Sequence, residues 1–121
     1  MTQMPSPRDV VTSYIAAMDS HNYGAARTYL GDSVRVKGPA GEAFRRPDEF
    51  LSMMQTHQGR YDVKKVFVDG NDVCVLYDLA TRTVTSFFCS WYQVENGKIV
   101  SIQTVFDPRP FAAAQEKQQP G

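Results

Sequence analysis

The sequence predicts an α+β domain in which three N-terminal helices pack on a curved antiparallel sheet. Two patterns lead to this prediction. Apolar residues recur at helical spacing in the first half of the chain, whereas apolar and polar residues alternate with a period of two from Tyr61 onward. The length of 121 residues fits one domain with its own core and is short for two.

Two helices are expected near the N-terminus. Ser6 can cap the first helix, and Pro7 suits its first position because proline needs no hydrogen bond there. Tyr14 lies in the apolar stripe of this helix. Asn22 can cap a second, shorter helix, which we expect to end at Gly31.

A short strand and a third helix follow. Residues 33–37 alternate and predict a strand that Gly38 and Pro39 interrupt. Pro47 can open the third helix, and Gly59 can end it. One side of this helix carries Phe50, Leu51, Met54 and His57.

The next two strands are expected over residues 61–68 and 73–81, joined by a turn at Asp69-Gly70-Asn71. Successive side chains of a strand point to opposite faces. In the second strand, one face therefore carries Val73, Val75, Tyr77 and Leu79, and the other carries Cys74, Leu76 and Asp78.

The segment from Val84 to Asp107 predicts a hairpin that is apolar on both faces. Asn96 and Gly97 form its turn, and we expect a three-residue loop that pairs Val94 with Lys98. One face then carries Phe88, Ser90 and Tyr92 with Val100, Ile102, Thr104 and Phe106; the other carries Phe87, Cys89, Trp91 and Gln93 with Ser101, Gln103, Val105 and Asp107. A one-residue error in this register would exchange the faces of the second strand.

The two faces of the hairpin predict two different surfaces. Because the helices can cover only one side of the sheet, the side with Phe87, Trp91 and Val105 is expected to form a sheet-to-sheet homodimer interface. On the other side, a curved sheet and a helix layer that diverge at one end would leave a conical, aromatic-lined pocket for an apolar small molecule.

Composition and motifs narrow the function further. Thirteen basic and thirteen acidic residues balance without a basic cluster, which argues against nucleic acid or a membrane surface as a partner. No apolar run approaches the ~20 residues of a membrane span, and the lack of a signal-peptide pattern predicts a cytoplasmic protein. Cys74 and Cys89 fit no metal or disulfide spacing, so we expect neighbouring packing thiols, no metal and no cofactor.

The pattern VVTSYIAAMDSHNYGAARTYLGDSVRVKGPAG, then a capped helix, then strands closing in NGKIVSIQTVFDP, resembles the nuclear transport factor 2-like (NTF2-like) superfamily. Within it, the chain is similar to the SnoaL-like and ketosteroid isomerase-like domains over roughly residues 7–110. The resemblance implies a cone-shaped, cystatin-like fold, usually a dimer, whose pocket serves unrelated chemistries. We therefore expect an N-terminal extension over residues 1–6, one domain over 7–110 and a flexible tail over 111–121.

The resemblance to the isomerases can be followed residue by residue. Tyr14 stands where those enzymes have a tyrosine that donates a hydrogen bond to the developing oxyanion. Their proton-moving aspartate corresponds to Gly38, and their second oxyanion donor, a protonated aspartate, corresponds to Ser90. Because a glycine cannot accept a proton, the comparison argues against steroid isomerisation by that mechanism.

Two other groups are candidates for acid-base work. Asp78 lies in an apolar run, where a carboxylate is costly unless it is paired or functional, although the expected register places it on the dimer side near Arg82 or Arg60. His57 ends the apolar stripe of the third helix, and histidine is the usual acid-base side chain near neutral pH. A histidine at that place can also serve only to stabilise the helix end.

Two hypotheses about function follow. The first is a SnoaL-like small-molecule-binding protein or a cofactor-free, isomerase-like or cyclase-like enzyme, with Tyr14, Asp78 and His57 as candidate catalytic residues. Tyr14 and Ser90 would donate hydrogen bonds to a ligand carbonyl. The expected pocket residues are Phe50, Met54, Tyr77, Phe88, Ser90, Tyr92, Ile102, Thr104 and Phe106. The second hypothesis is a non-catalytic dimeric domain used for association, with a filled or vestigial cavity.

Overall fold

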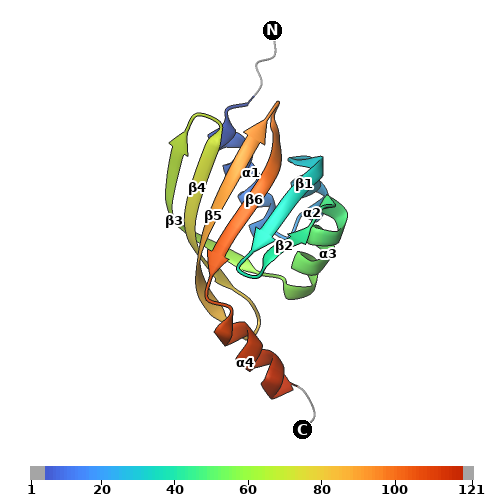
Figure 1. The fold of residues 1–121 in the computed structure, drawn as a ribbon, viewed down its shortest axis with the longest axis vertical. Coiled ribbons are helices and arrows are strands. Elements are labelled where there is room, and N and C mark those ends of the chain that lie inside the picture. The colour runs from blue at the N-terminus through green and yellow to red at the C-terminus, as the bar shows by residue number, and fades with distance from the viewer. Residues whose placement is uncertain (1–4, 119–121) are drawn as a thin grey trace.

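The structure, a computed structural model, describes residues 5–118 and consists of one curved, open sheet whose concave side is covered by the first three helices (Figure 1). The helices are α1 (Pro7–Asp19), α2 (Tyr23–Arg27), α3 (Pro47–His57) and α4 (Arg109–Gln118). The strands are β1 (Leu30–Gly38), β2 (Gly41–Phe44), β3 (Arg60–Asp69), β4 (Asp72–Ala80), β5 (Thr85–Glu95) and β6 (Lys98–Phe106). The predicted α+β cone is confirmed.

The six strands follow the order β2-β1-β6-β5-β4-β3. Neighbouring strands are antiparallel, except that β1 and β6 run parallel, so the sheet is mixed and not wholly antiparallel as expected. Val36 pairs with Ile102, which lies 66 positions later in the chain. The sequence pattern identifies strands but carries no signal for a pairing between such distant segments.

Both expected N-terminal caps are present. The backbone N–H of Asp9 donates to Ser6 Oγ at 3.1 Å, and that of Ala25 donates to Asn22 Oδ1 at 3.1 Å. The second helix is shorter than predicted, because Leu30 already pairs with Ile99 at the start of β1. Pairing with a buried strand thus replaces the last helical turn that local sequence favours.

The third helix ends one residue earlier than expected. Gln58, and not Gly59, takes the left-handed conformation after α3, with φ of 49°. Gly59 serves close packing instead, since a Cβ atom there would come within 2.7 Å of Leu79 Cδ1.

The turn between β5 and β6 is the two-residue type, which corrects the predicted three-residue loop. Asn96 and Gly97 both have positive φ, of 51° and 75°, and Glu95 pairs with Lys98. A bulge opposite the Gln93/Val94 step then shifts the register, so that Tyr92 faces Ile102 and Phe88 faces Phe106. The predicted faces therefore hold beyond the bulge. Before it, Ile99 occupies the buried position that was predicted for Val100.

The core lies between α1 and the concave face of the sheet. The alternation predicted for β4 is confirmed, because Val73, Val75, Tyr77 and Leu79 are buried while their neighbours are half-exposed. From α1, Val10, Val11, Tyr14, Ile15 and Met18 contribute buried side chains to the same core.

Two elements were not predicted. Strand β2 forms a short hairpin with β1 where the sequence suggested only a break, and residues 109–118 form α4 where it suggested a loose tail. Helix α4 projects from the narrow end of the body (Figure 1). Residues 1–4 and 119–121 of the expected extension and tail lie outside the described residues. Within residues 5–118, no helix is long and apolar enough to cross a membrane.

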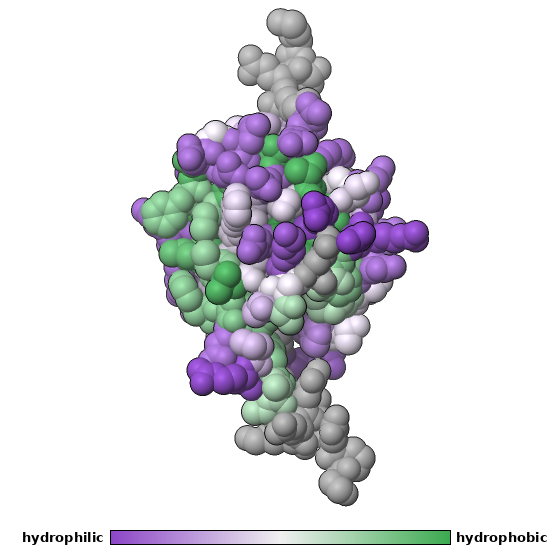
Figure 2. Space-filling view, viewed as in Figure 1, coloured by the Kyte–Doolittle hydropathy of each residue, from purple (hydrophilic) through white to green (hydrophobic). Residues whose placement is uncertain are grey.

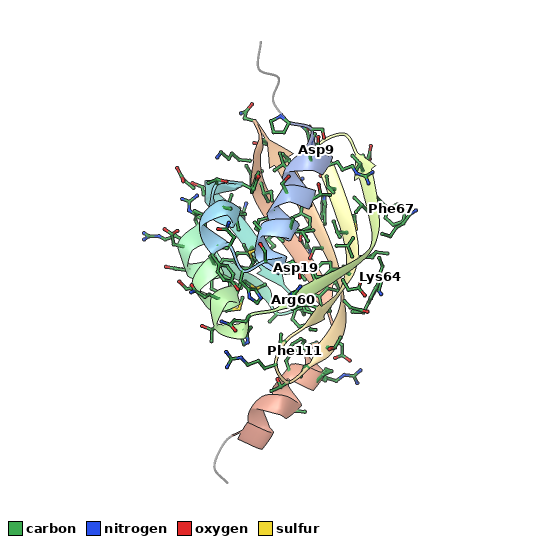
Figure 3. All side chains as sticks on the ribbon, turned by 180° about the vertical axis from the view of Figure 1, so that it is seen from behind. Asp9, Asp19, Arg60, Lys64, Phe67 and Phe111 are labelled. Atoms are coloured by element: carbon green, nitrogen blue, oxygen red, sulfur yellow. The ribbon has the colours of Figure 1, made fainter. Side chains whose placement is uncertain are left out.

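Asp19 ties the end of α1 to the start of β3 (Figure 3). Its Oδ1 atom accepts hydrogen bonds from Arg60 Nε and from the backbone N–H of Tyr61, both at 2.9 Å. The hydrogen bond from Arg60, followed by that from Tyr61, lowers the pKa of the Asp19 carboxyl below its usual value.

This contact predicts an acid-sensitive part of the stability. Because the folded-state pKa of Asp19 is lowered, its contribution is complete above the unfolded-state pKa of about 4 and is lost as the pH falls through the folded value. Urea unfolding should give Asp19→Asn a lower free energy of unfolding than wild type at about pH 7. This difference should become smaller toward about pH 2. Asp62→Asn, which alters an exposed ion pair with Lys64, is the matched control and should show no such narrowing. If Asp19→Asn lowered the free energy of unfolding by the same amount at every pH, the ionised Asp19 carboxyl would not have the stabilising role described here.

Candidate functional site: an aromatic cavity

A cavity of about 640 Å³ lies inside the cone, between the concave face of the sheet and helices α1 and α3. All nine residues predicted for the pocket line it: Phe50, Met54, Tyr77, Phe88, Ser90, Tyr92, Ile102, Thr104 and Phe106. They come from α3, β4, β5 and β6, so the inward-facing positions of three neighbouring strands form most of one wall. The volume is sufficient for a drug-sized ligand.

An unbroken row of aromatic rings runs across this wall. The ring centroids of Tyr61 and Tyr77 are 5.1 Å apart, those of Tyr77 and Phe88 are 5.5 Å apart, and those of Phe88 and Phe106 are 4.3 Å apart. The last pair is nearly parallel, with 9° between the ring planes. Such a row offers a flat, apolar surface on which a flat ligand can stack.

Phe111 closes one end of the row, and sequence reasoning missed it. Its ring stands edge-on to Phe88 and Phe106, with centroid distances of 6.1 and 5.4 Å. It lies on the first turn of α4, where the helix joins the body (Figure 3). The sequence signal that could have identified Phe111 was its position as an isolated aromatic residue within a polar tail.

The start of α4 is fixed by a pair of charged residues. Arg109 donates to Asp107 Oδ2 through Nη2 at 2.7 Å and to Oδ1 through Nε at 2.9 Å, and its backbone N–H also reaches Oδ1. These hydrogen bonds from Arg109 lower the pKa of the Asp107 carboxyl to about 2. The carboxylate therefore stays charged at neutral pH and supports the turn that carries Phe111.

The polar side of the cavity is a cluster of hydroxyl groups. Tyr77 Oη lies 2.8 Å from Ser90 Oγ, which lies 2.9 Å from Thr104 Oγ1. Ser90 is completely buried, and the hydroxyl of Tyr92 also interacts with those of Ser90 and Tyr77. Burial raises the pKa of Tyr77 to about 12, so this hydroxyl keeps its proton at neutral pH.

Tyr14 brings a further hydroxyl to the cavity from α1. Its side chain is buried and meets the Tyr92 ring edge-on, with centroids 6.0 Å apart. Among the described residues, none forms a hydrogen bond with the Tyr14 hydroxyl, and yet this atom is not sealed from the cavity. Burial, and next to it the Tyr92 hydroxyl, raises the pKa of Tyr14 well above its usual value. The site therefore holds a neutral O–H group that a ligand could accept from.

Of the other two candidate catalytic residues, Asp78 lies on the face of the sheet that its register predicted, and His57 lies at the edge of the cavity. Asp78 does not line the cavity but lies on the convex face, 3.8 Å from Lys64 Nζ rather than beside Arg82 or Arg60. Successive side chains of a strand point to opposite faces, and the neighbouring Tyr77 is buried on the concave face, so Asp78 points to the convex face. His57 borders the cavity at the end of α3, but its side chain is exposed, which suits the rim more than a buried acid-base role.

No aspartate or glutamate whose side chain is described lines the cavity. Gly38, at the position of the isomerase base, does line it, and open space surrounds the place where a Cβ would stand. Ser90, at the position of the second acid, is held by two other hydroxyls. The arrangement can donate and accept hydrogen bonds, but no carboxylate among the described side chains is placed there to move a proton.

A cone-shaped α+β fold around an apolar cavity defines the class of NTF2-like small domains. The chain belongs to the SnoaL-like domain family, whose model matches residues 11–102. No curated protein matches the chain.

Solved structures agree with this assignment. An NTF2-like protein of unknown function from Cytophaga hutchinsonii is 32% identical, with a TM-score of 0.85 over 93% of this chain and 99% of that one. A candidate ketosteroid isomerase from Kribbella flavida is 15% identical, with a TM-score of 0.77 over 84% and 77% of the two chains. A candidate polyketide cyclase from Sinorhizobium meliloti is 14% identical, with a TM-score of 0.70 over 79% and 93%. At these low identities, the last two show a shared fold alone.

Proposed function

We propose that this protein binds a flat, largely apolar small molecule in its cavity, as a binding protein or as a cofactor-free enzyme of the isomerase or cyclase kind. The observation that carries the proposal is the Tyr14 hydroxyl, which is buried, faces the cavity and has no partner among the described residues. Because this hydroxyl is open to the cavity, its hydrogen bond is available to a ligand oxygen, which would add a net hydrogen bond on binding. The aromatic row from Tyr61 to Phe106 would hold the apolar body of the same ligand.

Steroid isomerisation by a carboxylate base is not part of this proposal. A general base must lie within hydrogen-bonding reach of the proton that it removes. The position of that base is Gly38, and Asp78 lies on the other side of the sheet. If a reaction takes place here, it depends on placement of the substrate and on neutral hydroxyl donors.

Tyr14→Phe tests the proposal directly. Removing one buried hydrogen bond should weaken the binding of an aromatic ketone such as 9-fluorenone by about 1 kcal/mol, or about fivefold. Isothermal titration calorimetry would measure the change. Tyr29→Phe is the control, because Tyr29 is half-buried and does not line the cavity.

Two results would count against the proposal in different ways. If 9-fluorenone and related flat ketones do not bind to the wild-type protein, the cavity is not the ligand site that we propose. If they bind and Tyr14→Phe has the affinity of wild type, the cavity is a ligand site but Tyr14 does not contribute a hydrogen bond to the ligand.

A homodimer is the second part of the proposal. Phe87, Trp91 and Val105 are exposed on the convex face of the sheet, as predicted. Figure 2 shows this face, where apolar side chains gather over β3, β4 and β5. Monomers rarely expose patches of this kind. The same face supports the alternative function, in which the domain serves association and the cavity is vestigial.

A cytoplasmic location also remains a proposal. The Cys74 and Cys89 sulfur atoms lie 3.5 Å apart without a disulfide, and burial together with the contact to Cys89 raises the pKa of Cys74 to about 11. Cys74 thus fits an unreactive packing thiol, and a pair of neighbouring free thiols is usual in a reducing compartment.

A further inference from the structure

The hydroxyl cluster of Tyr77, Ser90 and Thr104 has no fixed donor direction. In each of its two hydrogen bonds, either oxygen can be the donor. A hydroxyl carries one proton and two lone pairs, so Ser90 can donate to Thr104 while it accepts from Tyr77, or the reverse. Rotation of the hydroxyl protons is enough to pass from one arrangement to the other.

Both arrangements are fully satisfied when a ligand oxygen meets Thr104, which lines the cavity. For a ligand carbonyl, Tyr77 donates to Ser90, Ser90 donates to Thr104, and Thr104 donates to the ligand. For a ligand hydroxyl that donates to Thr104, each bond reverses, and the Tyr77 proton turns to the hydroxyl of Tyr92, with which Tyr77 interacts. The Tyr92 proton can be donated to Ser90, with which Tyr92 also interacts, so every hydroxyl proton of the cluster has an acceptor in either case.

The hydrogen bonds of the cluster can reverse direction because its members are uncharged. In a site built around a carboxylate or an ammonium group, the charge fixes the direction of every hydrogen bond near it and rejects one form of the ligand. Here the members are uncharged hydroxyls, and no described carboxylate side chain lines the cavity. Lys37 and His57 are among the lining residues, but neither takes part in the hydrogen bonds of the cluster.

We propose that the cavity recognises both the carbonyl and the hydroxyl form of one flat aromatic ligand, and that the Tyr77, Ser90 and Thr104 hydroxyls adapt their hydrogen-bond direction to whichever form is present. This inference rests on the proposed function, because it assumes that the cavity holds a ligand. It identifies the ligand class as an uncharged ring system with a single ketone or alcohol oxygen at its polar end. Ser90 is a positioning residue, since both of its hydrogen bonds join other hydroxyls of the cluster and not the ligand.

Three probes with one carbon skeleton test this inference. Fluorene has no oxygen, 9-fluorenone has a carbonyl, and 9-fluorenol has a hydroxyl. Calorimetric titration of the full chain should find the ketone and the alcohol bound within about threefold of each other, and each at least about fivefold tighter than fluorene, which corresponds to one net hydrogen bond.

Variants then assign the effect to the cluster. Ser90→Ala should break the chain of hydroxyls and bring the affinities of the ketone and the alcohol down toward that of fluorene, while fluorene binding stays within about twofold. Thr104→Val should act in the same way without changing side-chain size, which provides a second route if Ser90→Ala folds poorly. Ser86→Ala is the matched control, since Ser86 lies on the same strand and does not line the cavity. Circular dichroism would establish that each variant is folded.

The outcomes separate the inference from the proposed function. If none of the three probes binds, the ligand cavity and this inference both fail. If all three bind equally, the cavity stands as an apolar ligand site, while this inference and the hydrogen bond from Tyr14 to the ligand are both overturned. A preference of more than about tenfold for either oxygenated probe would show a fixed hydrogen-bond direction and would also overturn it, as would unchanged selectivity in both Ser90→Ala and Thr104→Val.

Discussion

Replacing Phe88 by alanine is expected to lower the free energy of unfolding by about 3 kcal/mol. Phe88 is buried at the centre of the aromatic row, between Tyr77 and Phe106, with Phe111 against its edge. Alanine would remove these ring contacts and join their volume to the existing cavity. Because Phe88 already lines that cavity, fewer contacts are lost than at a fully packed site, so we expect the lower end of the range for such changes.

Phe87→Ala is the natural control for this experiment. Phe87 is the same residue type, one position earlier on β5, and it is 53% exposed on the convex face. Urea unfolding should show that Phe87→Ala lowers the free energy of unfolding by less than about 1 kcal/mol when the protein is dilute enough to be monomeric. Equal losses for the two variants would mean that the faces of β5 are not as described.

Alternation along the strands made the cavity wall predictable from the sequence. Side chains of β4 and β5 point in and out with a period of two, so Tyr77, Phe88 and Tyr92 follow from local pattern alone. The error in the loop after Val94 did not spread, because a bulge beside the turn returned the later residues of β6 to the predicted face. The correct assignment of the later β6 residues to the two faces of the sheet therefore depended on this bulge, which the sequence pattern does not show.

Features that depend on contacts between distant segments were not predictable in the same way. Phe111 is placed by rings from β5 and β6, and its helix begins at the hydrogen bonds between Asp107 and Arg109. The partner of Asp78 is Lys64, which follows from a bulge in β3 and from the pairing of β3 with β4.

Ser90 illustrates the same limit at the site. The sequence placed it in the pocket as a donor to ligand, and the structure adds that Tyr77 on β4 and Thr104 on β6 flank its hydroxyl from both sides. Such a cluster arises only when three strands are brought into register. Periodicity can place each of these residues on the concave face, but it cannot show which hydroxyls meet.

Trp91→Glu is expected to convert the proposed dimer to a monomer. Trp91 lies in the middle of β5 on the convex face, where it is 44% exposed even though its Nε1 donates to Asp72 at 2.9 Å. Phe87 and Val105, exposed by 53% and 62%, lie on the same face. A two-fold interface would bury the substituted residue twice, so two carboxylates would lose water without a cationic partner. A cost of several kcal/mol corresponds to a dissociation constant raised about a hundredfold or more.

Sedimentation velocity over a range of concentrations would measure this change. Ala16→Glu is the control, because it adds the same charge on the exposed side of α1, away from the convex face of the sheet, and should leave the dimer intact. Since Trp91 does not line the cavity, Trp91→Glu should keep its affinity for 9-fluorenone if the ligand site is complete within one chain. A variant that still forms dimers would place the interface elsewhere. Dissociation together with lost ligand binding would show that the convex face supports the cavity, and the association and binding hypotheses would then describe one function.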